Sequence, residues 1–133
     1  MDGQSVEVKG GGAAEFVFVS GDVGDVDIST GGGNDYVFVT DADVYGDANI
    51  NTGGGHDICS IVDATLYGAV DVSLGGGQDE LFIAYSSFYN SPDICFNGGG
   101  GNDIAYFTYN DIDLFEFLKK FENDDETDIE IIL

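Results

Sequence analysis

Positive charge is scarce in this sequence. The chain of 133 residues has three Lys or Arg against 26 Asp or Glu, for a formal net charge of −23. A surface of this sign is repelled by the phosphates of nucleic acids and by anionic lipid headgroups. Nucleic acid and membrane surfaces are therefore poor partners for this protein.

Long apolar runs are also absent, and proline and cysteine are rare. No stretch approaches the roughly 18 apolar residues that a membrane helix needs, and no apolar run near the first residue has the length of a cleaved signal peptide. Two cysteines are too few for a disulfide framework. The apolar content of 43% is enough for a packed interior, so the acidic chain is expected to fold as one domain.

Glycine is abundant, and most of it is clustered. The 21 glycines fall largely in runs at regular intervals, unlike the mixed Gly, Ser and Pro of a flexible linker. Five segments align without gaps around these runs, and they begin at Val6, Val26, Ala48, Val70 and Ile94. The steps between them are 20, 22, 22 and 24 residues, and self-similarity with such a period is typical of a solenoid.

Apolar residues alternate with polar ones on both sides of each glycine run. This period of two predicts two short strands per repeat, each with one buried face. The side chains predicted to face the core are those of Val6, Val8, Val17, Val19, Val26, Ile28, Val37, Val39, Ala48, Ile50, Cys59, Ile61, Val70, Val72, Leu81, Ile83, Ile94, Phe96, Ala105 and Phe107.

One such unit cannot bury its apolar face alone, whereas stacked coils share a continuous interior. The fold class predicted for residues 1–110 is therefore all-β: a parallel β-solenoid or β-roll of about five coils with two strands per coil. The second turn of each coil is long enough to hold a brief third strand, and this alternative stays open.

A carboxylate follows every glycine run. The five acids are Glu15, Asp35, Asp57, Asp79 and Asp103. Stacked coils would place them a few ångströms apart along one edge, where a bare row of carboxylates repels itself. A divalent cation between adjacent coils would remove this repulsion, and a shell of carboxylate and backbone oxygens suits Ca²⁺ better than Mg²⁺.

The spacing predicts three good calcium sites, formed by the pairs Asp35/Asp57, Asp57/Asp79 and Asp79/Asp103. A weaker or empty site is expected at Glu15, because Ala13 replaces the last glycine of that run. The backbone groups predicted to surround the ions are those of Gly31, Gly33, Gly53, Gly55, Gly75, Gly77, Gly99 and Gly101. The residue before each acid, Asn34 or His56 for example, is expected to use only its backbone.

A purely structural alternative explains the same turns. Glycine permits a positive φ at a tight corner, and an Asp side chain caps the backbone. This alternative accounts for the glycines, but it accounts less well for an acid at the same place in every copy of an already acidic chain.

The glycine runs resemble a known calcium-binding repeat. The stretch GGGGNDIAY, residues 98–106, fits the nonapeptide GGxGxDxUx of the RTX (hemolysin-type) class, and TGGGNDYVF, TGGGHDICS and LGGGQDELF lack only its first glycine. The resemblance covers about residues 6–107. It implies a β-roll whose turns enclose Ca²⁺, in a bacterial chain exported by a type I system with an uncleaved C-terminal signal. RTX rolls carry the motif on both edges of each coil, whereas this chain has it on one edge only.

The pattern changes in residues 111–133. Apolar residues recur there at helical spacing, followed by the acidic run ENDDETD and the apolar IEIIL. This segment is predicted to be a helical or strand cap that closes the last coil. Its resemblance to a type I secretion signal is a second interpretation, and the two are compatible.

The outward-facing residues of the two strand rows differ in character. The strand before each glycine run presents acidic and polar side chains, whereas the strand after it presents aromatic ones. The aromatic residues predicted to bind a partner are Phe16, Phe18, Tyr36, Phe38, Phe82 and Tyr106. Such a surface is larger than a monomer normally leaves in water, so a cover is expected: a second copy, a neighbouring domain, the C-terminal tail or a polysaccharide.

Tyr45, Tyr67 and Tyr89 are expected to form a ladder at the second turn that seals the end of the core, with a sugar platform as the alternative. Cys59 is predicted to point inward and Cys95 outward, so the two do not bond. His56 is the single histidine, and no nucleophile and base accompany it, so no catalytic site is predicted.

These patterns together predict a calcium-binding β-roll module of a secreted, extracellular bacterial protein. Its role would be structural, adhesive or matrix-forming, with folding that depends on calcium, and it would not be an enzyme. The alternative is a carbohydrate-binding accessory module of a secreted polysaccharide-acting protein.

Overall fold

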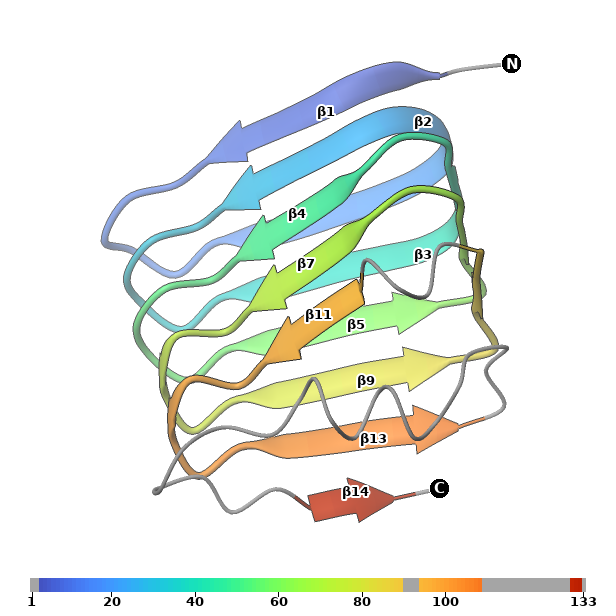
Figure 1. The fold of residues 1–133 in the computed structure, drawn as a ribbon. Coiled ribbons are helices and arrows are strands. Elements are labelled where there is room, and N and C mark those ends of the chain that lie inside the picture. The colour runs from blue at the N-terminus through green and yellow to red at the C-terminus, as the bar shows by residue number, and fades with distance from the viewer. Residues whose placement is uncertain (1–2, 90–93, 109–129, 133) are drawn as a thin grey trace.

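A computed structural model describes residues 3–89, 94–108 and 130–132 of the chain. Every regular element in these residues is a β-strand. The described residues contain no helix long and apolar enough to cross a membrane. The strands pair in parallel and wind into a solenoid of about five coils, as the repeat predicts (Figure 1).

Two layers of strands face each other across the core (Figure 1). The strands of the layer before the glycine turns are β1 (Gln4–Lys9), the second half of β2 (Phe16–Ser29), β4 (Ala48–Asn51), β7 (Val70–Ser73) and β11 (Ile94–Asn97). The strands of the layer after them are the first half of β2, β3 (Tyr36–Val44), β5 (Ile58–Val62), β9 (Glu80–Ala84), β13 (Ile104–Thr108) and β14 (Glu130–Ile132). Because β2 continues around a corner, it belongs to both layers.

The pairing register reproduces the sequence repeat. Along one layer Val6 pairs with Val26, Val26 with Ala48, Ala48 with Val70, and Val70 with Ile94. The other layer follows the same steps from Phe16 through β3, β5 and β9 to β13. Residues at the same position of successive repeats therefore lie directly above one another, about 4.8 Å apart.

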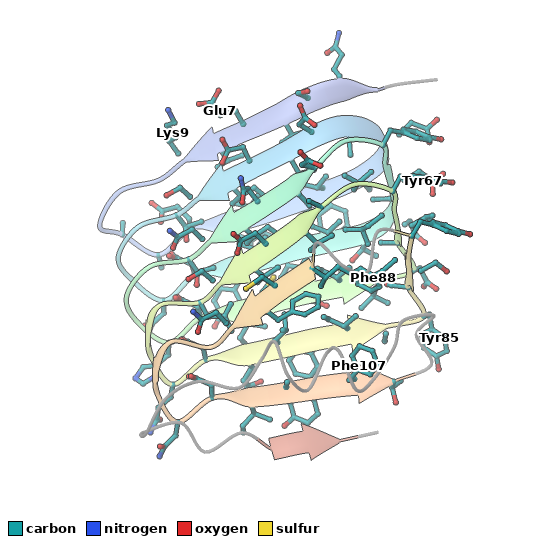
Figure 2. The ribbon with its side chains drawn as sticks, in the orientation of Figure 1. Glu7, Lys9, Tyr67, Tyr85, Phe88 and Phe107 are labelled. Carbon is teal, nitrogen blue, oxygen red and sulfur yellow. The ribbon has the colours of Figure 1, made fainter. Side chains whose placement is uncertain are left out.

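The core lies between the two layers and contains the side chains that the alternation predicts. Those in the region from Val17 to Phe107 are all buried, and Val6 and Val8 are partly buried against them. Figure 2 shows Phe88 and Phe107 in this interior. Cys59 is fully buried, and desolvation raises the pKa of its thiol to about 12. Cys95 is exposed, and neither cysteine forms a disulfide.

The second turn of the coil contains a short third strand. β6 (Thr65–Leu66) pairs with the end of β3 on one side and with β10 (Ser87–Phe88) on the other. The prediction of two strands per coil is therefore incomplete, and the third-strand alternative holds. Its physical basis is a buried row at this corner, in which Val44, Leu66 and Phe88 each bury their side chains.

Stacked tyrosines lie along the same corner, as predicted. The ring centroids of Tyr45 and Tyr67 are 5.1 Å apart and those of Tyr67 and Tyr89 are 5.2 Å apart, with interplanar angles of 7° and 9°. Figure 2 shows Tyr67 on the edge opposite the glycine turns. Most of residues 111–133, for which a cap is predicted, lies outside the described residues. Within that segment, β14 pairs with β13 and extends one layer.

Candidate metal centre

The glycine turns stack along one edge of the solenoid (Figure 1). Backbone bridges join Gly32 to Gly54 and Gly54 to Gly76, and the ladder continues through β8 (Gly76–Gly77) and β12 (Gly100–Gly101). The turns therefore pair with one another much as the strands do.

Two glycines of every run except the first have a backbone that requires glycine. Gly53 has φ 89° and Gly55 has φ 136°, both in the left-handed region. A Cβ at Gly53 would collide with the carbonyl of Gly31, and a Cβ at Gly55 with the carbonyl of Gly33. The same pattern continues in the runs that end at Gly77 and Gly101. Close stacking of the turns is thus possible only without side chains at these positions.

Several glycine carbonyls predicted to face a cation are already hydrogen-bonded between coils. The N–H of Gly54 donates to the carbonyl of Gly31 at 2.9 Å, and equivalent bonds reach the carbonyls of Gly53 and Gly75 at 2.8 and 2.7 Å. A carbonyl oxygen has two lone pairs, so each retains one acceptor position.

The aspartates that follow the turns lie in one row and are turned inward. Asp35, Asp57, Asp79 and Asp103 are at most 1% exposed. In each pair of neighbours, one carboxylate oxygen, Oδ1, accepts the backbone N–H of the aspartate in the preceding coil, at 2.8 Å for Asp57, 2.9 Å for Asp79 and 3.1 Å for Asp103. The capping proposed by the structural alternative is therefore present, although the capped N–H belongs to the neighbouring coil.

The other carboxylate oxygen has no such partner. Oδ2 of each of the four aspartates, and Oε2 of Glu15, is buried without a hydrogen bond. Leaving a buried polar atom unpaired is costly, and native structures rarely tolerate a repeated row of such atoms without an explanation. A cation or a proton beside each of these oxygens would remove the cost of burying it unpaired.

The same environment disfavours ionisation. Burial raises the pKa of the Asp57 and Asp103 carboxyls above their ordinary value. Burial also raises the pKa of Asp79 to about 7, and the charges of Asp103 and Asp57 on either side add to the effect. A cation beside the row would reverse this tendency, because it favours the ionised form.

Glu15 ends the row differently. Its backbone N–H donates to Oδ1 of Asp35 at 2.8 Å. Its own carboxylate turns back into its turn and accepts the N–H of Gly11 at 3.2 Å. Glu15 thus joins the row mainly through its backbone.

The donor set of the row fits a hard divalent cation. Each level between neighbouring coils brings together two carboxylates, each with an unpaired oxygen, and oxygen donors are what Ca²⁺ binds. In the part of the chain that the structure describes, no group of three or more His, Cys, Asp or Glu side chains gathers as a metal site. A bound ion would thus take two carboxylates from a level and the rest of its shell from backbone oxygens or water.

Two further ladders of side-chain hydrogen bonds at this edge were not predicted from the sequence. The side chain of Asn34 accepts the N–H of His56 at 2.9 Å, and Nδ1 of His56 accepts the N–H of Gln78 at 3.2 Å. The expectation that the residue before each acid uses only its backbone is therefore wrong. The shared signal is a side-chain acceptor in every copy after the first, whether an amide oxygen or a ring nitrogen.

The second of these ladders uses threonine hydroxyls. Thr30 donates to the carbonyl of Thr52 at 3.1 Å, and Thr52 donates to the carbonyl of Leu74 at 2.8 Å. All three side chains are fully buried beside the glycine turns. The recurrence of threonine at the same place in two repeats is the signal for this ladder.

The residues predicted to bind a partner are unevenly exposed. Phe16, Phe18 and Tyr36 are 69%, 60% and 40% exposed, whereas Phe38, Phe82 and Tyr106 are half-buried. The rings of Phe82 and Tyr106 stack at 4.5 Å, so each covers part of the other. Among these six residues the strongly exposed rings therefore lie in the first two coils, whereas the other strongly exposed rings, those of Tyr67, Tyr85 and Tyr89, belong to later coils.

Comparison with protein-family models, with curated proteins and with solved structures found no match. The resemblance to the RTX class accordingly depends on the repeated turn motif alone.

Proposed function

We propose that this chain is a calcium-binding β-solenoid module of a secreted bacterial protein, with a structural or adhesive role. The observation that carries the proposal is the row of aspartates along one edge, each with a buried and unpaired carboxylate oxygen. Adjacent coils would hold Ca²⁺ through Asp35, Asp57, Asp79 and Asp103, with Glu15 contributing least.

Calcium would act as the stabiliser of the stack. An ion that binds only the folded chain raises the free energy of unfolding by mass action, by about 2.7 kcal/mol at a hundred times its Kd. Calcium is scarce in the cytosol and plentiful outside the cell. A chain with a net charge of −23 would therefore gain stability on export, and this supports an extracellular location.

The test compares the chain freed of metal by a chelator with the chain in excess calcium. We expect calcium to raise the melting temperature by several degrees, about 4 °C for each kcal/mol in a chain whose length lies between small and medium-sized domains. Circular dichroism and ion content by mass spectrometry provide the measurement. An unchanged melting curve with no bound ion would refute the proposal.

A matched pair of variants separates the row from general charge effects. Asp57→Asn with Asp79→Asn removes two charges from the row and keeps Oδ1 as an acceptor. Asp27→Asn with Asp71→Asn removes two charges from exposed positions on the outer face. Only the first pair is expected to abolish the calcium response.

A carbohydrate-binding role is the second candidate, and the exposed rings of Phe16, Phe18 and Tyr36 favour it. The tyrosine ladder does not favour it. Its near-parallel rings stack on one another, so most ring faces that a sugar would use are occupied by neighbouring rings. We place this role second because only three of the six predicted partner-binding rings are strongly exposed, whereas the carboxylate recurs in every coil.

A further inference from the structure

The first coil forms one end of the stack. Among the strands of the described residues, β1 pairs only with β2, and Figure 1 shows it as the outermost strand of its layer. Val6 and Val8 are only partly buried, whereas Val26 and Ile28, at the same positions of the next coil, are each 1% exposed. The described residues therefore cover the core less completely at this end than in the coil that follows.

The open edge of β1 presents backbone groups at alternate residues. The N–H of Gly10 donates to the carbonyl of Ser29 in the next coil at 2.7 Å. Because alternate residues of a strand direct their backbone groups to opposite sides, those of Val8 also point toward β2, whereas those of Glu7 and Lys9 point away from it. An edge of this kind is a template for a further strand.

The other layer ends in a similar edge, formed by the first half of β2. The N–H of Tyr36 donates to the carbonyl of Glu15 at 2.9 Å. The same alternation directs the backbone groups of Val17 toward β3 and those of Phe16 and Phe18 toward the open end. The rings of Phe16 and Phe18 are 69% and 60% exposed. Both layers thus end in a strand with backbone groups that face outward.

This end of the stack is also the least acidic part of the solenoid. Residues 3–20 contain two acids and one Lys, whereas residues 21–38, an equal length, contain four acids and no Lys or Arg. The charges of β1 are those of Glu7 and Lys9, which Figure 2 shows at this end. Their side chains are 62% and 76% exposed. A second copy of the chain therefore meets less repulsion here than at the acidic outer face.

Charge selects one register for an antiparallel pairing of β1 with β1 of a second copy. With Val8 opposite Val8, Glu7 of each copy lies opposite Lys9 of the other, and these are the residues whose backbone groups face outward. The nearest registers that keep the same hydrogen bonds place Glu7 opposite Glu7 or Lys9 opposite Lys9. Opposite charges across a strand pair stabilise it, whereas like charges destabilise it.

The two-fold axis of this pairing also fits the second layer. Cδ of Glu15 lies 2.8 Å from the place where a Cβ of Gly10 would be, so these two residues face each other across the turn. Val8 precedes Gly10 by two residues, and Val17 follows Glu15 by two residues. An axis that passes through Val8 and perpendicular to the layers therefore passes close to Val17.

We propose that the end of the stack formed by the first coil is a two-fold dimer interface, at which a second copy of this chain continues both layers with antiparallel strands. Across the interface Glu7 pairs with Lys9 in one layer. Phe16 lies opposite Phe18 in the other layer, as an aromatic pair of the kind that stabilises sheets. A two-fold contact closes on itself, so it joins two stacks and does not build a fibre. This inference does not rest on calcium binding.

Sedimentation equilibrium of the full chain, in excess calcium and about 0.15 M salt, tests the interface. We expect a reversible equilibrium between monomer and dimer. Lys9→Glu and Glu7→Lys each place like charges opposite one another twice in the dimer, so each should raise the dissociation constant about tenfold or more. Both substitutions in one chain restore opposite charges in the same register and should restore the dimer.

Two further samples separate this register from general charge effects. Asp71→Lys, at an exposed position on the outer face, changes the net charge as Glu7→Lys does and should leave the dissociation constant within about twofold. An equimolar mixture of the Lys9→Glu and Glu7→Lys chains pairs each Glu with a Lys only in the mixed dimer. The mixture should therefore associate about tenfold more tightly than either variant alone.

The outcomes decide the proposal. A chain that stays monomeric up to about 1 mM overturns it, as does a dimer that Lys9→Glu and Glu7→Lys leave unchanged. Polymers that lengthen with concentration would indicate end-to-end stacking and would overturn the two-fold contact. Circular dichroism verifies the fold of each variant, and if one single variant does not fold, the other decides. Calcium binding is measured separately, so the proposed function stands or fails independently of these results.

Discussion

Every glycine run except the first contains glycines of two kinds, and the difference is a property of single residues. Gly55 adopts a left-handed φ, and the carbonyl of Gly33 occupies the place where its Cβ would be. Gly54 has no atom within 4 Å of such a Cβ and has no positive φ. The two neighbours thus form a natural pair for testing how the turns stack.

We predict that Gly55→Ala lowers the free energy of unfolding by about 2 kcal/mol or more, since the new Cβ both strains the backbone and collides with the coil below. Gly54→Ala should change it by less than about 0.5 kcal/mol or stabilise the chain slightly. Urea denaturation of both variants in excess calcium measures the difference. Equal effects of the two substitutions would contradict the described turn geometry.

At the scale of the strand, a residue in the left-handed region marks the corner that follows the glycine run in each of the first four coils, inside β2 and β3 and directly after β5 and β9. Asp41, Asp63 and Tyr85 have φ of 51°, 52° and 53°, and Gly21, which pairs with Ala42 across a register shift, has φ 83° at the corner of the first coil. These residues turn the chain out of its layer and into the short third strand. A left-handed residue with a side chain costs energy that glycine does not incur.

The prediction for this element compares glycine with alanine at two aspartates. At Asp63, which is exposed, Asp63→Gly should be more stable than Asp63→Ala by about 1 kcal/mol, because only glycine adopts this φ without strain. At Asp43, in the strand β3, Asp43→Ala should instead be more stable than Asp43→Gly, by about 0.5–1 kcal/mol. Thermal or urea unfolding of the four variants tests both orders. Alanine more stable than glycine at both sites would refute the assignment of φ at Asp63.

The regular strands were predictable from the sequence because one pairing rule is repeated in every coil. Each coil aligns the same positions, and the changes in repeat length fall in the second turn, where they do not disturb the register of Val26, Ala48 and Val70. The third strand was left open because a unit as short as Thr65–Leu66 shows no alternation. The third strand is buried because neighbouring coils pack against it, and the local sequence pattern carries no information on that packing.

The candidate site was predictable in place but not in orientation. The spacing puts the aspartates on one edge. It does not show that the carboxylates turn inward, or that each Oδ1 accepts a hydrogen bond from the backbone N–H of the aspartate in the preceding coil. The acceptors Asn34 and His56 were missed because different side chains perform the same task. Chemical equivalence between an amide oxygen and a ring nitrogen is not visible as a repeated letter.

At the scale of the whole molecule, the folded chain has little internal neutralisation of its charge. Lys9 is the one Lys or Arg in the described residues, and it pairs with Glu7 at 2.9 Å in a solvent-exposed contact. Exposed pairs of this kind contribute little to stability. The acidic outer face and the buried row thus rely on protons or on cations from solution.

Stability of the metal-free chain is therefore expected to depend on pH in an unusual direction. The pKa of Asp79 is raised from 3.8 to about 7 in the folded chain, and the pKa values of Asp57 and Asp103 are raised as well. At pH values between the ordinary pKa of 3.8 and the raised pKa of about 7, the folded chain binds more protons than the unfolded chain. The free energy of unfolding therefore falls as the pH rises between these two values. Under the proposed function, saturating calcium would hold the carboxylates ionised in the folded state and should remove or reverse the fall.

Urea denaturation at about pH 5 and about pH 8, with a chelator and with excess calcium, tests this dependence. Asp79→Asn should flatten the metal-free profile, because an amide does not titrate. Asp71→Asn, an exposed position on the outer face, removes the same charge and should leave most of the slope. A metal-free chain whose stability rises between these pH values, with or without Asp79, would show that the buried row is ionised without a cation and would remove the physical reason for calcium to bind there.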